Sequence, residues 1–107
     1  MAQNLGEFEQ LILLALMRLS DDAYGMSVRT EISSRTGRDV SISAVYTTLE
    51  RLETKGHAES YVGEPTARRG GRRKKHYRMT AAGVTALERS YQALHEMASG
   101  LGLESIS

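Results

Sequence analysis

Residues 6–19 constrain the fold most, because their apolar side chains form two stripes when the segment is placed on a helix. At 100° per residue the two stripes lie on opposite sides. A surface helix of a monomer needs only one such stripe. The segment is therefore either a central helix wrapped by its own neighbours or, as we favour, a helix shared with a second copy of the chain. The first stripe contains Phe8, Leu11, Ile12, Ala15, Leu16 and Leu19, and the second contains Leu13, Leu14 and Met17.

The remaining residues predict two more helices, a hairpin and a last helix. Gly37 and Gly56 stand where helices end, and Ser43 and Thr80 stand where helices begin. Ser20, Asp21 and Asp22 are expected to cap the second helix. The expected helices cover about 24–36, 43–55 and 81–99, and the expected strands cover 58–63 and 75–79.

This order predicts a fold that is mainly α with a small β-hairpin. It corresponds to a winged helix-turn-helix, in which one helix enters the major groove of DNA and the hairpin, or wing, lies beside it. The 107 residues fit one compact domain. Within it we expect the winged helix-turn-helix at residues 1–80, and a dimerisation helix with its tail at residues 81–107.

Positive charge is concentrated in the predicted wing, although the formal net charge of the chain is only +1. Seven of the 14 Lys+Arg residues lie between Arg68 and Arg78 with no acid among them, which leaves the rest of the chain at −6. Such a segment is attracted to DNA phosphates through the release of counterions, whereas the alternative is a solvated loop. The predicted phosphate-binding residues are Arg68, Arg69, Arg72, Arg73, Lys74 and Lys75.

The third helix carries the candidate groups for recognising DNA. Its inner stripe is apolar, and its outer side bears small, hydroxyl-bearing and charged residues. Hydroxyls and a guanidinium suit both phosphates and base edges, whereas a solvated helix surface is the alternative for each residue taken alone. The candidate DNA-binding residues on this helix are Ser43, Ala44, Tyr46, Thr47, Thr48 and Arg51.

The last helix carries an apolar seam with three- and four-residue steps, which is typical of helices that pair. The seam is expected to pack against the first helix and a partner chain, with the chain's own core as the alternative. The predicted dimer interface contains Leu13, Leu14, Met17, Leu87, Tyr91, Leu94 and Ala98.

Several function classes have no support in the sequence. The chain has no cysteine, which excludes disulfides and thiolate metal sites. The three histidines, His57, His76 and His95, lack the spacing of a metal or catalytic motif, so we expect no metal, no cofactor and no enzyme activity. The longest apolar run has seven residues, far below the ~20 of a membrane span. A cytoplasmic protein without a membrane partner is the default.

Several short motifs follow one another along the chain: GEFE followed by LILLAL, then AYGM, VYTTLERLE with Lys55-Gly56, and RRKKHYRMT with Gly83. Their order and spacing resemble the PadR family of bacterial winged-helix transcriptional regulators over essentially the whole chain. The resemblance implies a homodimeric repressor that dimerises through its C-terminal helix, with the third helix in the major groove. Small family members take planar drugs into an apolar pore at the dimer centre, for which Phe8, Tyr91 and Met97 are the candidates here.

The expected function is therefore sequence-specific binding of double-stranded DNA by a homodimer, as a repressor. Two-fold symmetry predicts an inverted-repeat operator with half-sites ~10 bp apart. The sequence does not decide whether a small-molecule effector relieves repression. The alternative function is a winged-helix interaction module that docks on an acidic protein partner, because a cationic loop is attracted to any polyanion.

Overall fold

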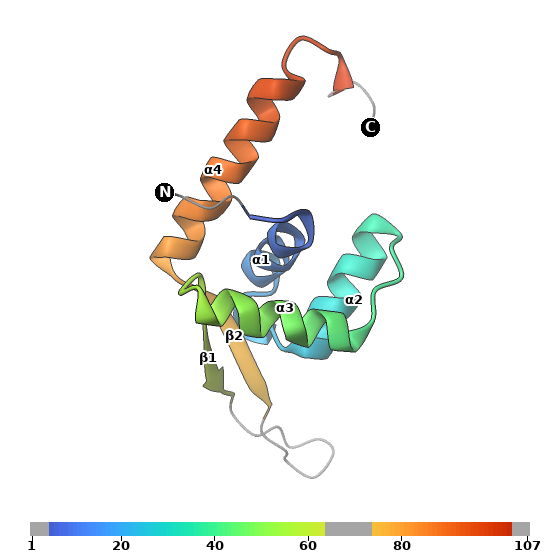
Figure 1. Ribbon diagram of the computed structural model, residues 1–107. Coiled ribbons are helices and arrows are strands. Elements are labelled where there is room, and N and C mark those ends of the chain that lie inside the picture. Colours follow the sequence, from blue (N-terminus) through green and yellow to red (C-terminus); the bar gives the residue numbers. More distant parts are fainter. Residues whose placement is uncertain (1–4, 64–73, 104–107) are drawn as a thin grey trace.

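The computed structural model describes residues 5–63 and 74–103. Three helices form the body of the molecule: α1 (Glu7–Leu19), α2 (Gly25–Thr36) and α3 (Ile42–Thr54). A short 3-10 helix, η1 (Ser20–Asp22), joins α1 to α2. The hairpin of β1 (Ala58–Val62) and β2 (Lys75–Met79) follows α3, and α4 (Ala81–Ala98) rises away from the body (Figure 1). The predicted fold class, mainly helical with one small hairpin, is confirmed.

The core lies where the three body helices meet the hairpin. Each helix contributes a stripe at three- and four-residue spacing, and β2 contributes one tyrosine. Burial of each of these side chains stabilises the fold by about 2 kcal/mol. The largest fully buried side chains are Tyr77, Ile12, Leu13, Leu49, Leu52, Val28 and Val45.

Leu13 corrects the predicted two-sided character of the first helix. It is fully buried in the core of its own chain, so it does not belong to a dimer interface. Leu14 and Met17, its companions in the second stripe, are 42% and 56% exposed. The prediction failed at Leu13 because this position borders the first stripe, and α2 and α3 both pack against α1. The chain's own neighbours therefore cover part of what looked like a second apolar face.

The helix ends show which polar residues fix the boundaries. Gly37 ends α2 in the left-handed conformation at φ 72°, and the Thr80 hydroxyl accepts the N–H of Gly83 at 3.0 Å, as predicted. The cap of α3 is Ser41 rather than Ser43, because the Ser41 hydroxyl accepts the N–H of Ala44 at 3.1 Å. Ser43 therefore lies inside the first turn of α3.

The start of α2 also differs from the prediction. Ser20, Asp21 and Asp22 form the 3-10 turn, and the N-cap is Tyr24. The N–H of Tyr24 donates to the hydroxyl of Ser27 at 2.9 Å. A hydroxyl inside the helix therefore binds the N-cap backbone, which replaces the expected cap from the preceding turn.

The hairpin pairs in antiparallel register from Ala58 opposite Met79 to Val62 opposite Lys75. The segment before α2 joins its other edge: the N–H of Tyr77 donates to the carbonyl of Ala23 at 2.9 Å, and Tyr24 forms a bridge with His76. No local pattern in the sequence predicts this pairing of the Ala23–Tyr24 segment with β2. It ties the hairpin directly to the start of α2.

Helix α4 is fixed at its N-terminal end and projects at its C-terminal end. Thr80 binds the backbone of the α3–β1 connection through both its N–H and its hydroxyl, and Gly83 lies against the same connection. Gly83, Leu87 and Ser90 are the buried residues of the helix, whereas every residue from Tyr91 to Met97 is exposed. The projection gives the molecule its elongated shape, with principal extents of 53 × 33 × 21 Å (Figure 1).

Candidate nucleic-acid interface

Helix α3 is amphipathic, with a fully buried inner side and a polar outer side. Val45, Leu49 and Leu52 are 0% exposed and hold the helix against α1 and α2. Five of the six predicted DNA-binding residues on this helix lie exposed on its other side. They are Ser43, Ala44, Tyr46, Thr47 and Arg51. This outer face, which we call the α3 face, presents hydroxyls and one guanidinium, the groups that hydrogen-bond phosphates and base edges.

Thr48 is the exception among the predicted residues. It is only 5% exposed and lies three residues after Val45 and four before Leu52, on the buried side of α3. Its assignment as a DNA contact is therefore wrong. The buried side of α3 is wider than its apolar residues alone indicate, and it includes the hydroxyl of Thr48.

Tyr46 joins the α3 face to the start of α2. A Cβ atom at Gly25 would lie 2.4 Å from the Tyr46 ring and 2.5 Å from its hydroxyl oxygen, so the ring occupies the space that any other residue at position 25 would fill. The tyrosine remains 43% exposed. Gly25 therefore permits a close approach that places the Tyr46 hydroxyl beside the first turn of α2.

The base of the wing carries two exposed lysines, Lys74 next to the start of α2 and Lys75 next to the last turn of α3. The Lys74 ammonium lies 4.0 Å from the centre of the Tyr24 ring, which is a cation–π contact. The Lys75 ammonium lies 3.9 Å from a carboxylate oxygen of Glu53 on α3. Arg68, Arg69, Arg72 and Arg73 lie outside the described residues, and their phosphate contacts stay a prediction.

Arg78 has its charge largely matched, unlike Lys74. Its guanidinium donates to Glu59 at 3.0 Å and lies 4.7 Å from the centre of the Tyr61 ring. In the part of the chain that the structure describes, Lys74 forms no ion pair with a carboxylate. The unmatched positive charge at the wing base is therefore next to Tyr24, close to the α3 face.

A buried ion pair fixes the far end of α3 to α1. Glu9 is 5% exposed; one carboxylate oxygen accepts the N–H of Gly6 at 2.8 Å and the other lies 2.8 Å from the ammonium of Lys55. Burial alone would raise the pKa of Glu9. The hydrogen bonds from Lys55 and Gly6 and the positive charges of Lys55 and Arg51 outweigh burial and lower that pKa below its usual value. Glu9 is therefore charged near neutral pH, and it holds the C-terminal end of α3.

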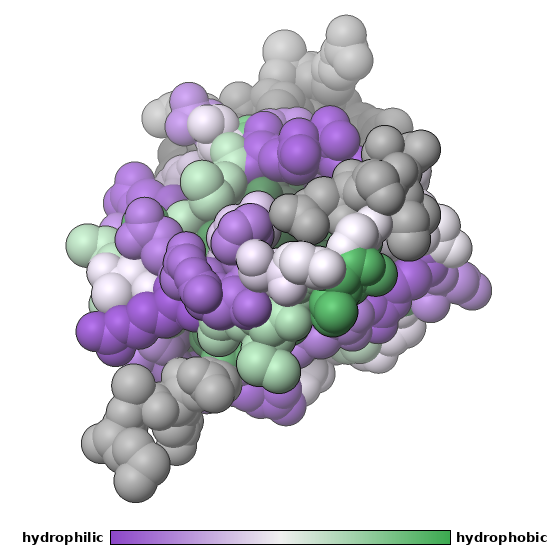
Figure 2. Space-filling view, turned by 90° about the horizontal axis from the view of Figure 1, so that it is seen from above, coloured by the Kyte–Doolittle hydropathy of each residue, from purple (hydrophilic) through white to green (hydrophobic). Residues whose placement is uncertain are grey.

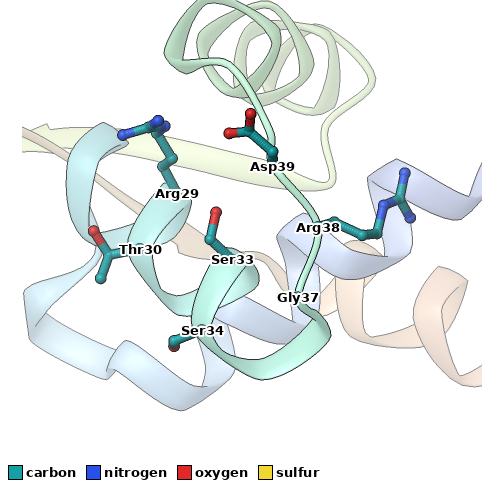
Figure 3. Close-up of a pocket in the computed structure, with 7 residues that line it drawn as sticks. All are labelled: Arg29, Thr30, Ser33, Ser34, Gly37, Arg38 and Asp39. Carbon is teal, nitrogen blue, oxygen red and sulfur yellow. The ribbon is translucent and has the colours of Figure 1, made fainter.

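A shallow cavity of about 470 Å³ lies on the other side of α2, at its turn into α3 (Figure 3). Its walls are polar: hydroxyls of Thr30, Ser33 and Ser34, with Asp39 and two arginines at its edges. Arg29 is held by the carbonyl of Val40 at 2.8 Å, and the Arg38 side chain points away to Glu7. The cavity therefore lies along the end of α2 and the connection that leads into α3.

Residues 5–63 and 74–103 contain neither a candidate metal site nor a helix able to span a membrane. No group of three or more His, Cys, Asp or Glu side chains within them is close enough to hold a metal ion. None of their helices is long and apolar enough to cross a membrane.

Comparison with known proteins agrees with this geometry. The family model for PadR-like transcriptional regulators matches residues 13–89, which include the second half of α1, all of α2 and α3, the hairpin and the first half of α4. The chain belongs to the PadR-like family of transcriptional regulators. Family membership implies regulation through DNA binding, and it makes the α3 face and the wing base the candidate interface.

The relatives of this PadR-like chain include one protein and several solved structures. An uncharacterised protein of Lysinibacillus sphaericus is 36% identical over 84 residues, which cover 77% of this chain and 72% of that protein. A PadR-family regulator from Clostridium difficile R20291 has a TM-score of 0.72 at 22% identity, with 95% of this chain and 100% of that chain covered. A PadR-like regulator from Bacillus cereus has a TM-score of 0.71 at 21% identity, with 94% and 92% covered. These structural similarities show the shared fold.

The residues predicted for dimerisation of this PadR-like chain have different surroundings. Leu14, Met17, Tyr91 and Leu94 are exposed, between 42% and 64%, and are available to a partner. Leu87 is only 7% exposed and belongs to the core of its own chain, so its assignment to the interface is wrong for the same reason as that of Leu13. Ala98 lies half-buried at the end of α4.

The three candidate pore residues do not share one environment within a single chain. Phe8 packs against the core beneath the guanidinium of Arg38, which lies 5.9 Å from the ring centre. The Tyr91 ring stacks on His95 at 6.3 Å, and Met97 is 80% exposed. A pore that contains all three would need a second chain, and it stays a prediction.

Sequence reasoning missed three residues that shape the interface. Glu9 looked like a surface acid, and its burial depends on Lys55, 46 positions away. Gly25 looked like an ordinary helix start, and its requirement follows only from the position of Tyr46. His76 lacks the spacing of a metal or catalytic motif and so drew no functional role, whereas the structure places it at the centre of the wing base. The one feature of the sequence that pointed to these three residues is that each lies in a motif that resembles the PadR family: GEFE, AYGM and RRKKHYRMT.

Proposed function

We propose that this PadR-like regulator is a homodimeric repressor that binds an inverted-repeat operator. The observation that carries the proposal is the continuity between the α3 face and the wing base. Tyr46 of α3 lies against Gly25, and Tyr24, the next residue, lies beneath the ammonium of Lys74. One surface therefore presents side chains for the base edges of a groove and a cation for the adjoining phosphates.

The electrostatics favour DNA as the partner. The described wing base contributes Lys74 and Lys75, and the sequence adds four arginines in residues 64–73, while the rest of the chain is acidic. Attraction to DNA is thereby restricted to the wing side of the molecule. A DNA-binding surface of this kind gains affinity from phosphates and specificity from the α3 face.

The experiment measures fluorescence anisotropy with DNA from upstream of the protein's own gene and with a random duplex of equal length. We expect tighter binding to the upstream DNA and protection of two half-sites ~10 bp apart. Equal, weak binding to both duplexes that disappears at moderate salt would contradict the proposal. That result would favour the alternative, a module that docks on an acidic protein.

The support for a dimer comes from the free half of α4. Tyr91, Leu94 and Met97 are 64%, 60% and 80% exposed, and Leu101 and Leu103 beyond them are 70% and 52% exposed. Figure 2 looks down onto the end toward which α4 rises, and it shows apolar groups in green at the surface among purple hydrophilic groups. Exposed apolar seams of this kind are covered in partner interfaces, and symmetric pairs are the commonest assemblies.

The dimer has its own test, Leu94→Asp, which places an unpaired charge in the seam. We expect monomers or aggregates in analytical ultracentrifugation. Ala93→Asp is the matched control, because Ala93 is an exposed neighbour outside the seam and adds the same charge. A Leu94→Asp protein that sediments as a well-folded dimer would show that the seam faces elsewhere.

The effector and the cellular location belong to the same proposal. We propose that the protein acts in the cytoplasm, and that any small-molecule effector that relieves repression is held between two chains, near Phe8, Tyr91 and Met97. A selection of bound sequences from random DNA, repeated with candidate effectors, tests both the operator and the effector. Unchanged operator affinity with every planar apolar compound would argue against the pore.

A further inference from the structure

The wing base contains an alternating stack of cationic and aromatic side chains with a histidine at its centre. The His76 ring lies 5.4 Å from the Tyr24 ring, edge to face, and 5.5 Å from the Tyr61 ring. Lys74 lies on the Tyr24 ring and Arg78 on the Tyr61 ring, at 4.0 and 4.7 Å from their centres. The imidazole therefore lies between two aromatic rings, and each of those rings also contacts a cation.

The backbone fixes the position and the tautomer of this imidazole. The His76 Nδ1 atom lies 2.9 Å from the carbonyl oxygen of Lys74, and because a carbonyl only accepts, Nδ1 carries a hydrogen. A Cβ atom at Gly63 would lie 2.4 Å from the ring, so only glycine permits the ring to lie over the opposite strand. The other nitrogen, Nε2, has no hydrogen-bond partner among residues 5–63 and 74–103. Nε2 is therefore the atom at which the ring gains a proton.

The charged groups around His76 come from four elements. Lys75 and Arg78 lie on its own strand β2, and Lys74 directly precedes that strand; Glu59 of β1 is bound to Arg78. The η1 turn packs beside β2 and carries the exposed carboxylates Asp21 and Asp22. Lys75 is drawn to Glu53 of α3. Glu59 and Glu53 already lie beside cations, Arg78 and Lys75 respectively. A positive charge on His76 therefore has no carboxylate of its own.

We propose that His76 is a phosphate-binding group of the wing base that takes up a proton when the protein binds DNA. Histidine is the side chain whose charge ordinarily changes between about pH 5 and about pH 8. A DNA phosphate supplies the negative charge that the wing base lacks, and an Nε2–H donates to a phosphate oxygen. Binding and protonation then strengthen one another, since linkage between two ligands is reciprocal. This inference rests on the proposed DNA-binding function.

The experiment compares affinities for a mixed-sequence fluorescent duplex at about pH 6 and about pH 8, at constant low ionic strength. For the unmodified protein we expect binding about fivefold or more tighter at the lower pH. The slope of log affinity against log salt is expected to become steeper by about 0.9 for each added phosphate contact. His76→Gln keeps an N–H for the Lys74 carbonyl but has no titrating charge, so its affinity should match the unmodified protein at about pH 8 and change little toward about pH 6.

The other two histidines of the chain provide matched controls. His95→Gln lies on the exposed side of α4 and His57→Gln at the α3–β1 connection, and both variants should keep the pH dependence of the unmodified protein. A His76→Gln protein with that same pH dependence would overturn the inference. So would equal affinity of the unmodified protein at the two pH values, although the proposed function would then stand. No DNA binding at either pH would overturn both.

A second measurement needs no variant. Titration calorimetry of the unmodified protein with the same duplex, in buffers of different ionisation enthalpy, counts the protons taken up on binding. We expect net uptake near neutral pH, and uptake indistinguishable from zero would overturn the inference even where His76→Gln fails to fold.

Discussion

The ion pair between Glu9 and Lys55 leads to a quantitative prediction about stability. The perturbation is Glu9→Gln, which keeps the shape of the side chain and removes its charge. The glutamine oxygen still accepts the N–H of Gly6, so the variant isolates the interaction with Lys55, at 2.8 Å in the unmodified protein. The Glu9 side chain is 7% exposed and that of Lys55 is 30% exposed, so water screens this pair only partly.

The geometry sets the expected magnitude. A hydrogen bond between charged groups contributes about 1.5–3 kcal/mol, and the exposure of Lys55 places the expected loss near 2 kcal/mol. Lys55→Met should cost more, because it leaves a buried carboxylate without its cation. Its cost has an upper limit of about 3.5 kcal/mol at neutral pH, because Glu9 avoids the unpaired charge by taking up a proton, at about 1.4 kcal/mol per pH unit.

The dependence on pH separates this account from a simple packing defect. The pKa of Glu9 is lowered in the folded protein from its ordinary value of 4.5. The ion pair therefore stabilises the fold fully above pH 4.5, and this contribution is lost as the pH falls through the lowered value. The difference in unfolding free energy between Glu9→Gln and the unmodified protein should be largest near neutral pH and should shrink below pH 4.5.

The assay is urea denaturation at several pH values and at one fixed protein concentration, because association changes apparent stability. Glu7→Gln is the matched control: Glu7 also has an ion pair, with Arg38 at 2.9 Å, but its side chain is 77% exposed, so its loss should cost less than about 0.5 kcal/mol. The reasoning is refuted if Glu9→Gln costs no more than this control at neutral pH, or if its cost is the same at every pH.

Three further substitutions test how close contacts hold the interface. Gly83→Ala puts a Cβ atom 2.1 Å from the backbone oxygen of His57. Although alanine ordinarily favours helices, we expect the free energy of unfolding, measured by urea denaturation, to fall by about 2 kcal/mol. A gain in stability would contradict this packing. Gly25→Ala displaces the Tyr46 ring, and we expect lower DNA affinity with an unchanged circular dichroism spectrum; unchanged affinity would separate Tyr46 from binding. Arg51→Ala should reduce the preference for operator over random DNA, measured by anisotropy, and equal losses on both would assign it to phosphate positioning.

The sequence predicted the order of elements because local chemistry decides helix ends. Gly37, Thr80 and the bounds of β2 act within a few residues of themselves, and the structure confirms them. Ser41 and Ser43 show the limit of this reasoning. Serine is a favourable N-cap residue at both positions. The N-cap is Ser41 because its hydroxyl accepts the N–H of Ala44, and the sequence alone does not show which of the two hydroxyls meets a free N–H.

The candidate site was harder to predict because burial depends on distant neighbours. Thr48, Leu13 and Leu87 all lie at the edges of helical stripes, where periodicity does not decide between core and surface. Their burial follows from the angles at which α2, α3 and α4 cross α1, which no local pattern encodes. Ser43, Tyr46, Thr47 and Arg51 are exposed as predicted because they lie opposite the centre of the stripe, where such angles matter least; their contacts with DNA stay a prediction.

The segment Ala23–Gly25 links the α3 face to the wing base, the two parts of the candidate DNA interface. On one side its Ala23 carbonyl accepts the N–H of Tyr77, and the Tyr24 ring contacts both His76 and Lys74. On the other side Gly25 lies against Tyr46 of α3. The recognition helix and the wing therefore meet on three consecutive residues, which set the angle between them. Substitutions in this segment should change groove contacts and phosphate contacts together, whereas substitutions at Arg51 or Lys74 change one of the two.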